Sequence, residues 1–215
     1  MSEVGLRTVA GVLMILVALT AEWFGGTVFA VFVAAVATVM YYEWARLVRG
    51  WGLQWHVAGF FYALLPALAL LWVRERAGQP LSDTGFALVL WAFIVTWAAD
   101  IGAFFVGRAF GGPKLAPRIS PNKTISGLVG GVVAATLLGG IWAQFNGLHW
   151  AWLVLAPVFA LAAAGGDLFE SWLKRQAGVK DAGALIPGHG GVLDRLDGLV
   201  PVALLTGGAV IAGLA

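Results

Sequence analysis

Long apolar segments separated by short polar stretches constrain the fold of this chain more than any other feature. A membrane-spanning helix needs about 17–25 apolar residues, and seven segments approach or reach that length: residues 8–24, 27–48, 57–73, 85–110, 127–145, 149–166 and 199–214. Of the 215 residues, 60% are hydrophobic and 11% are charged, whereas soluble domains carry about 25% charged residues. We therefore expect an all-α, polytopic integral membrane protein, with about seven transmembrane helices in one domain over residues 1–215.

The basic residues fall unequally on the two sides of the expected membrane. Of the 13 Lys and Arg residues, only Arg74 and Arg76 fall on the side opposite the N-terminus. Basic loops face the cytoplasm, so we expect a cytoplasmic N-terminus and an external C-terminus, in a bacterial inner (cytoplasmic) membrane. Cysteine is absent, which excludes disulfides and thiolate metal sites. The net charge of +2 is small, and no nucleic-acid partner is expected.

Residues 166–197 form a polar island in this apolar chain. They hold five of the 11 acidic residues, together with four basic residues and His189. The acidic residues are Asp167, Glu170, Asp181, Asp194 and Asp197, and the basic ones are Lys174, Arg175, Lys180 and Arg195. Ionisable residues are costly in a membrane and mark functional sites there. We therefore expect the chemistry in this island, facing the cytoplasm.

Helical spacing orders the first half of the island. Asp167, Glu170, Ser171 and Lys174 fall on one helix face, and Gly178 is a suitable helix stop. The Gly-rich residues 187–191 cannot continue the helix, and they let backbone N–H groups approach an anion. A second helix is expected from Val192.

In that second helix Asp194 and Asp197 lie three residues apart, which places them on one face. Carboxylate oxygens suit Mg²⁺, while cations and N–H donors suit phosphates. The pattern therefore indicates a metal–phosphate site.

Asp100 is a second polar feature, because it lies well inside the fourth apolar segment. A charge at mid-span costs about 2.5–3.5 kcal/mol on insertion scales. Asp100 and Arg108 follow helical spacing, so they could line one groove; the alternative is a buried ion pair that holds two helices together. The basic, proline-stiffened loop 112–124 follows on the side of the polar island.

These residues resemble the signature of the phosphatidate cytidylyltransferases, or CDP-diacylglycerol synthases. The matching positions are Ser171-x-x-Lys174-Arg175, Lys180-Asp181, Pro187-Gly188-His189-Gly190-Gly191 and Asp194-Arg195-x-Asp197, within a signature region of 166–198. A second motif over 100–127 is similar too: Lys114-Leu115-Ala116-Pro117 and Ser120-Pro121-x-Lys123-Thr124. Gly198 replaces the family's Ser, and Ser126 stands where the family often has Glu, so no carboxylate role carries over to Ser126.

The resemblance implies that CTP and phosphatidic acid react to give CDP-diacylglycerol and pyrophosphate. It implies Mg²⁺ as the cofactor and leaves a second cation open. It implies catalytic roles for Asp167, Lys174, Asp194 and Asp197, of which Asp167, Asp194 and Asp197 would hold the metal. The implied substrate-binding residues are Asp100, Lys114, Ser120, Lys123, Thr124, Ser171, Arg175, Lys180, His189, Gly190, Gly191 and Arg195. The lipid phosphate is already ionised near neutral pH, so His189 is expected to donate to phosphate or organise the loop rather than act as a base.

Two other function classes stay open. One is a related CTP-dependent membrane enzyme that acts on a polyprenol or an ether lipid. The other is an ion-coupled transporter whose path runs past Asp100 and Asp167, although a transporter has no need for the signature loop. Homodimer formation is also left open.

Overall fold

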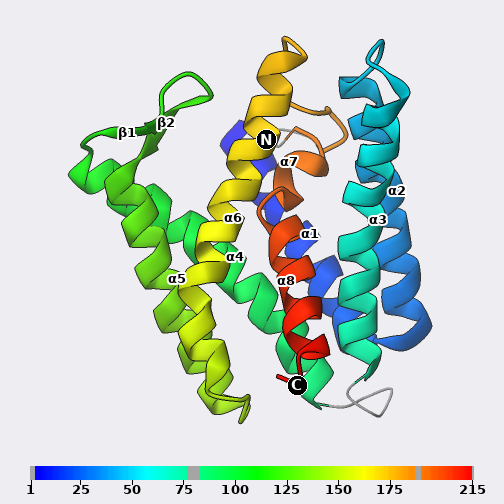
Figure 1. Ribbon diagram of the computed structural model, residues 1–215, viewed down its shortest axis with the longest axis vertical. Coiled ribbons are helices and arrows are strands. Elements are labelled where there is room, and N and C mark those ends of the chain that lie inside the picture. The colour runs from blue at the N-terminus through cyan, green and yellow to red at the C-terminus, as the bar shows by residue number, and fades with distance from the viewer. Residues whose placement is uncertain (1–2, 77–82, 187–189, 215) are drawn as a thin grey trace.

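The computed structural model describes residues 3–76, 83–186 and 190–214. The chain forms a helical bundle with one small hairpin (Figure 1). The elements are α1 (Glu3–Phe24), α2 (Gly26–Leu47), α3 (Leu53–Arg76), α4 (Asp83–Phe110), β1 (Lys114–Ala116), β2 (Ser120–Thr124), α5 (Ile125–Phe145), α6 (Ala151–Gln176), α7 (Leu193–Leu196) and α8 (Leu199–Ile211). The predicted all-α membrane class is confirmed.

Length and apolarity qualify five of the described helices as membrane spans: α2, α3, α4, α5 and α6. The apolar parts of α1 and α8, Thr8–Phe24 and Leu199–Ile211, are shorter. The expected number of seven spans therefore stays a prediction. Helix α8 has 13 residues, which at 1.5 Å per residue gives a length of about 20 Å.

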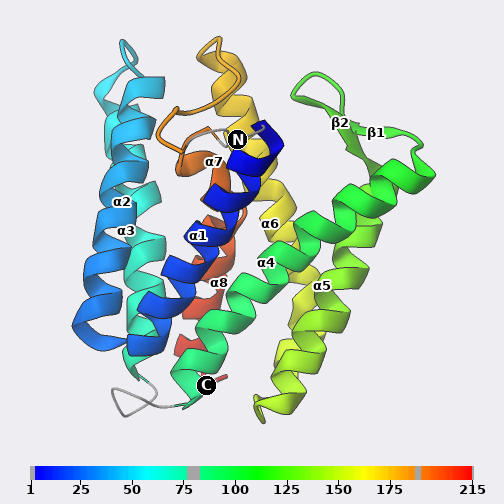
Figure 2. The ribbon, with the colours of Figure 1, turned by 180° about the vertical axis from the view of Figure 1, so that it is seen from behind.

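Helix α4 crosses the bundle diagonally and packs closely on α5 (Figure 2). Small residues permit this approach, as is usual between membrane helices. A Cβ on Gly127 would lie 2.8 Å from the carbonyl oxygen of Ala103, and one on Gly102 would lie 2.8 Å from that of Gly130. The indole of Trp91 donates a hydrogen bond to the Gly139 carbonyl at 3.0 Å. The α4–α5 pair thus forms a rigid support for the hairpin that joins its two helices.

The predicted polar loop 112–124 contains a two-stranded antiparallel hairpin. Its last residue, Thr124, is the N-cap of α5, because its hydroxyl accepts a hydrogen bond from the Gly127 N–H at 3.1 Å. The hairpin, α7 and the N-terminus lie at one end of the bundle, and the C-terminus lies at the other (Figure 1). The polar elements are therefore gathered at one end.

Helix α6 continues ten residues beyond the expected span end at residue 166, to Gln176. The predicted stop is confirmed, because Gly178 follows with a φ of +72°. Asp194 of α7 contacts Lys174 in the last turn of α6. The short α8 begins directly after α7, so Asp194 and Asp197 lie between the end of α6 and the start of α8.

Candidate active site

Lys174 lies at the centre of the polar residues at this end of the bundle. Its Nζ is 2.6 Å from Asp194 Oδ1 and 3.1 Å from Glu170 Oε2. All three side chains are buried, and that of Glu170 is fully buried. Glu170 is one helical turn before Lys174 on α6, as the spacing predicted, whereas Asp194 comes from α7. One ammonium group therefore neutralises two carboxylates from different parts of the chain.

Backbone N–H groups also bind Asp194. The Gly191 N–H donates to Asp194 Oδ2 at 2.7 Å, and the Ala182 N–H reaches both oxygens, at 2.9 and 3.2 Å. Burial raises the pKa of Asp194, but the hydrogen bond from Lys174 and those from the two N–H groups outweigh it, so the pKa lies below its usual range. Asp194 is thus an ionised carboxylate with its oxygens engaged.

Asp197, one turn further along, has the opposite electrostatic environment. Burial raises its pKa well above the usual range, and the negative charges of Asp167 and Glu170 add to this effect. Its Oδ1 accepts a hydrogen bond from the Gly198 N–H at 2.8 Å. Asp197 also shares a side-chain hydrogen bond with Glu170. Either a proton or a bound cation must lie between two carboxyl groups in such contact.

Asp167 connects the two predicted motifs. Its Oδ2 forms an ion pair with Lys123 of the hairpin, and its Oδ1 accepts a hydrogen bond from the Ser171 hydroxyl at 3.3 Å. Arg175 Nε also donates to the Ile119 carbonyl at 3.3 Å. These contacts bring the second motif against α6, as its position on the same side of the membrane suggested.

The glycine loop is used differently from the expectation. The Gly191 N–H is taken by Asp194, and Gly190 has a φ of +85°, with an added Cβ placed 2.9 Å from Asp194 Oδ2. Gly191 thus binds the Asp194 carboxylate through its N–H, and Gly190 leaves the space that this carboxylate occupies. Their predicted contact with a substrate phosphate stays a prediction, and His189 lies outside the described residues.

The other predicted site residues lie mostly at the surface. Asp100 and Arg108 are exposed and, within the described part of the chain, form no ion pair with each other. Thr124 has the structural role of capping α5, which the sequence did not predict. Ser120 is half-buried in the hairpin, and the remaining predicted residues are exposed: Lys114, Lys180 and Arg195. Their substrate contacts stay predictions.

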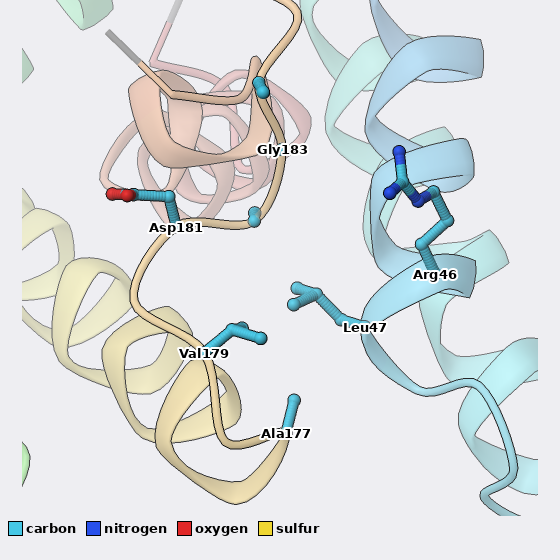
Figure 3. Close-up of a pocket in the computed structure, with 8 residues that line it drawn as sticks. Arg46, Leu47, Ala177, Val179, Asp181 and Gly183 are labelled. Carbon is cyan, nitrogen blue, oxygen red and sulfur yellow. The ribbon is translucent and has the colours of Figure 1, made fainter.

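A cavity of about 270 Å³ lies between the end of α2 and residues 177–184 (Figure 3). Arg46 and Leu47 line it from α2, and Val179 lines it from the opposite segment. The Asp181 side chain points away from these three residues (Figure 3). The cavity is therefore lined by one basic side chain and several apolar ones. It lies beside the group formed by Lys174, Glu170 and Asp194, not within it.

Sequence reasoning missed two acidic residues. Glu170 was seen on the helix face but given no role, although it shares Lys174 with Asp194. Glu43 was not considered, yet it is fully buried and accepts a hydrogen bond from the Leu193 N–H at 2.8 Å. The argument that drew attention to Asp100, a carboxylate within an apolar segment, applies equally to Glu43.

The model of the cytidylyltransferase family matches residues 51–210. The chain belongs to this family. A phosphatidate cytidylyltransferase of Brucella suis is 37% identical, covering 95% of this chain and 92% of the relative. Phosphatidate cytidylyltransferases of Haemophilus influenzae and Staphylococcus epidermidis are 46% and 47% identical over 65% and 53% of this chain, and over 51% and 45% of the relatives.

In this cytidylyltransferase the site combines cations with hard oxygen donors, which is the chemistry needed to bind a metal–nucleotide complex. Within residues 3–76, 83–186 and 190–214, no three acidic or histidine side chains are arranged to hold a metal ion. The donor types nevertheless fit Mg²⁺, because Glu170 and Asp197 bring two buried carboxyl groups into contact and Asp167 adds its negative charge nearby. Asp167 would have to exchange Lys123 for such an ion.

Proposed function

We propose that this chain is a phosphatidate cytidylyltransferase, which transfers CMP from CTP to phosphatidic acid. The observation that carries the proposal is the cluster of Lys174, Lys123 and their carboxylate partners at one end of a membrane-protein bundle. A water-soluble nucleotide and a membrane lipid can both reach such a place. The names of the relatives support the same substrates.

In the reaction, an oxygen of the lipid phosphate attacks the α-phosphorus of CTP. The bond from that phosphorus to the bridging oxygen of the β-phosphate breaks, and pyrophosphate leaves with the electron pair. The lipid phosphate has a second pKa near 6, so it is already a nucleophile near neutral pH. The protein therefore needs to position the reactants and neutralise charge more than it needs to remove a proton.

The basic residues of the two motifs would do this work. Lys123 and Lys174 already neutralise carboxylates, and either ammonium can turn to a phosphate oxygen when a cation takes over its carboxylate. Arg175 and Arg195, at the same end of the bundle, would hold the outer phosphates. Ser171, one turn from Asp167, would add a hydroxyl donor.

Mg²⁺ is the proposed cofactor, and it would neutralise phosphate charge and polarise the α-phosphoryl group. Asp167, Asp194 and Asp197 are the proposed ligands, of which the sequence favoured Asp167 and Asp194; a second cation also stays a proposal. Asp194→Asn tests the assignment of Asp194. Loss of a ligand should weaken Mg²⁺ binding by about 10–100-fold, which raises the Mg²⁺ concentration needed for half-maximal transfer. An unchanged Mg²⁺ requirement would restrict Asp194 to its contact with Lys174.

We also propose a bacterial inner membrane, with the polar end of the bundle in the cytoplasm, where CTP is found. The distribution of basic residues supports this orientation, and the N-terminus lies at the polar end (Figure 1). Homodimer formation, left open by the sequence, stays a prediction.

The decisive assay supplies CTP labelled in its α-phosphate to the purified protein with Mg²⁺ and one lipid at a time. We expect label in the lipid product with phosphatidic acid, and little with a polyprenol or an archaeal ether lipid. Lys174→Met provides the inactive control. Transfer to the polyprenol or the ether lipid in preference to phosphatidic acid would replace the proposed substrate, and no transfer to any lipid would contradict the enzyme class.

A further inference from the structure

Glu43 belongs to the first half of the chain. Its carboxylate lies against the signature loop, which is the segment between Lys180 and Asp197. Glu43 lies in α2, one turn before that helix ends at Leu47, and its side chain is fully buried. A buried carboxylate is costly unless it is paired or hydrogen-bonded. Within the described residues, no Lys or Arg forms an ion pair with it. Among the described residues, its Oε2 accepts one backbone hydrogen bond and its Oε1 has no hydrogen-bond partner.

The signature loop provides this hydrogen bond and the space beside the carboxylate. Leu193, the first residue of α7, donates its N–H to Glu43 Oε2 at 2.8 Å. A Cβ on Gly191 would lie 2.6 Å from Oε2 and 2.7 Å from Oε1, and one on Gly183 would also strike Oε1. Neither glycine has a positive φ, so conformational freedom does not explain them. They are small because the Glu43 carboxylate occupies the adjacent space.

The same two backbone segments hold Asp194. Gly191 donates its N–H to Asp194 while its Cα faces Glu43. On the other segment, Ala182 donates to Asp194 while its neighbour Gly183 contacts Glu43. Displacement of either segment would therefore change both carboxylate environments together.

We propose that Glu43 is a positioning residue for the transfer reaction, which fixes the loop backbone so that Asp194 meets Lys174. The 2.6 Å contact between Asp194 and Lys174 depends on where residues 191–193 place the start of α7. Glu43 reaches that backbone from α2, which lies outside both motifs. The activity part of this inference rests on the proposed function, whereas its structural part does not.

The test compares Glu43→Gln and Glu43→Ala in the purified full-length protein, with Glu75→Gln as the matched control on an exposed carboxylate at the end of α3. Amide hydrogen exchange of residues 182–194 is measured by mass spectrometry, alongside CMP transfer from CTP to phosphatidic acid. We expect faster exchange in this segment, most in Glu43→Ala, and a loss in kcat of about 10–100-fold, as for partners that orient metal-site ligands. Glu75→Gln should match the parent protein.

Gly191→Ala gives a second readout, which a general packing role would not reproduce. In the parent protein the new methyl group meets Glu43, so we expect lower turnover and faster loop exchange. In the Glu43→Ala background that obstacle is gone, and the same substitution should add little, because residues that act through one contact are not additive. Losses that multiply in the double variant would overturn the proposal.

The remaining outcomes are also decisive. Unchanged exchange of residues 182–194 in Glu43→Ala would overturn the proposal, as would faster exchange with full turnover. If Glu43→Ala does not fold, Glu43→Gln carries the same test with a side chain of nearly the same shape. If the parent protein transfers no CMP, the proposed function fails by itself, and the exchange data still decide whether Glu43 fixes the loop.

Discussion

Replacement of Lys174 by methionine removes the cation that two carboxylates share and nearly keeps the side-chain length. The exposed fractions of the Lys174, Asp194 and Glu170 side chains are 11%, 5% and 0%, so solvent cannot replace the lost contacts. Removal of one partner of a buried ion pair costs about 3–5 kcal/mol. On the scale of ~2–4 °C per kcal/mol for soluble chains of 150–250 residues, we expect Tm to fall by about 6–20 °C.

The assay is thermal unfolding in detergent, followed by tryptophan fluorescence, together with CMP transfer. Arg49→Met, which removes an exposed cation from the turn after α2, is the stability control and should leave Tm near that of the parent. The double variant Lys174→Met/Asp194→Asn removes both charges, so we expect it to regain about 0.5–3 kcal/mol relative to the sum of the single losses while staying inactive. Strictly additive losses, or a Lys174→Met protein as stable as the parent, would refute the reasoning.

Three further predictions concern the loop, the far end of the bundle and the orientation. Gly190→Ala should abolish most turnover, because its methyl group meets Asp194, whereas Gly50→Ala at a similar φ of +88° meets no atom within 4 Å; equal kinetics in the two variants would contradict this. Arg74→Met should lower Tm but not kcat, because it removes the ion-pair partner that lies 3.0 Å from the buried Glu22 carboxylate. A second change, Glu22→Met, should restore Tm, and no recovery would exclude a stabilising role for this ion pair. A C-terminal reporter active only in the cytoplasm should be silent, and a bright signal would reverse the orientation.

The sequence predicted the membrane helices well because the length and polarity of each apolar segment are local properties. The same holds for the α6 face that carries Asp167, Ser171 and Lys174, since helical spacing alone brings these residues together. The hairpin was not predicted, because its strands of three and five residues are short and lack a run of apolar or β-branched residues.

Contacts between distant segments were the other limit. Glu43 and Leu193 are 150 residues apart, and no spacing rule connects them. The sequence predicted that the loop glycines contact a substrate phosphate, and this stays a prediction. The tertiary structure adds that the Gly191 N–H binds Asp194 and that Gly183 and Gly191 leave space for Glu43.

The shortness of α8 has a consequence for how lipid and nucleotide meet. Its length of about 20 Å is some 10 Å less than the hydrocarbon thickness of a bilayer, and Asp194 and Asp197 come directly before it. If α8 spans the bilayer in the proposed enzyme, we expect these carboxyl groups to lie at the depth of the lipid phosphates, so that the nucleotide comes to the lipid. We then expect selection between lipids to depend on the head group.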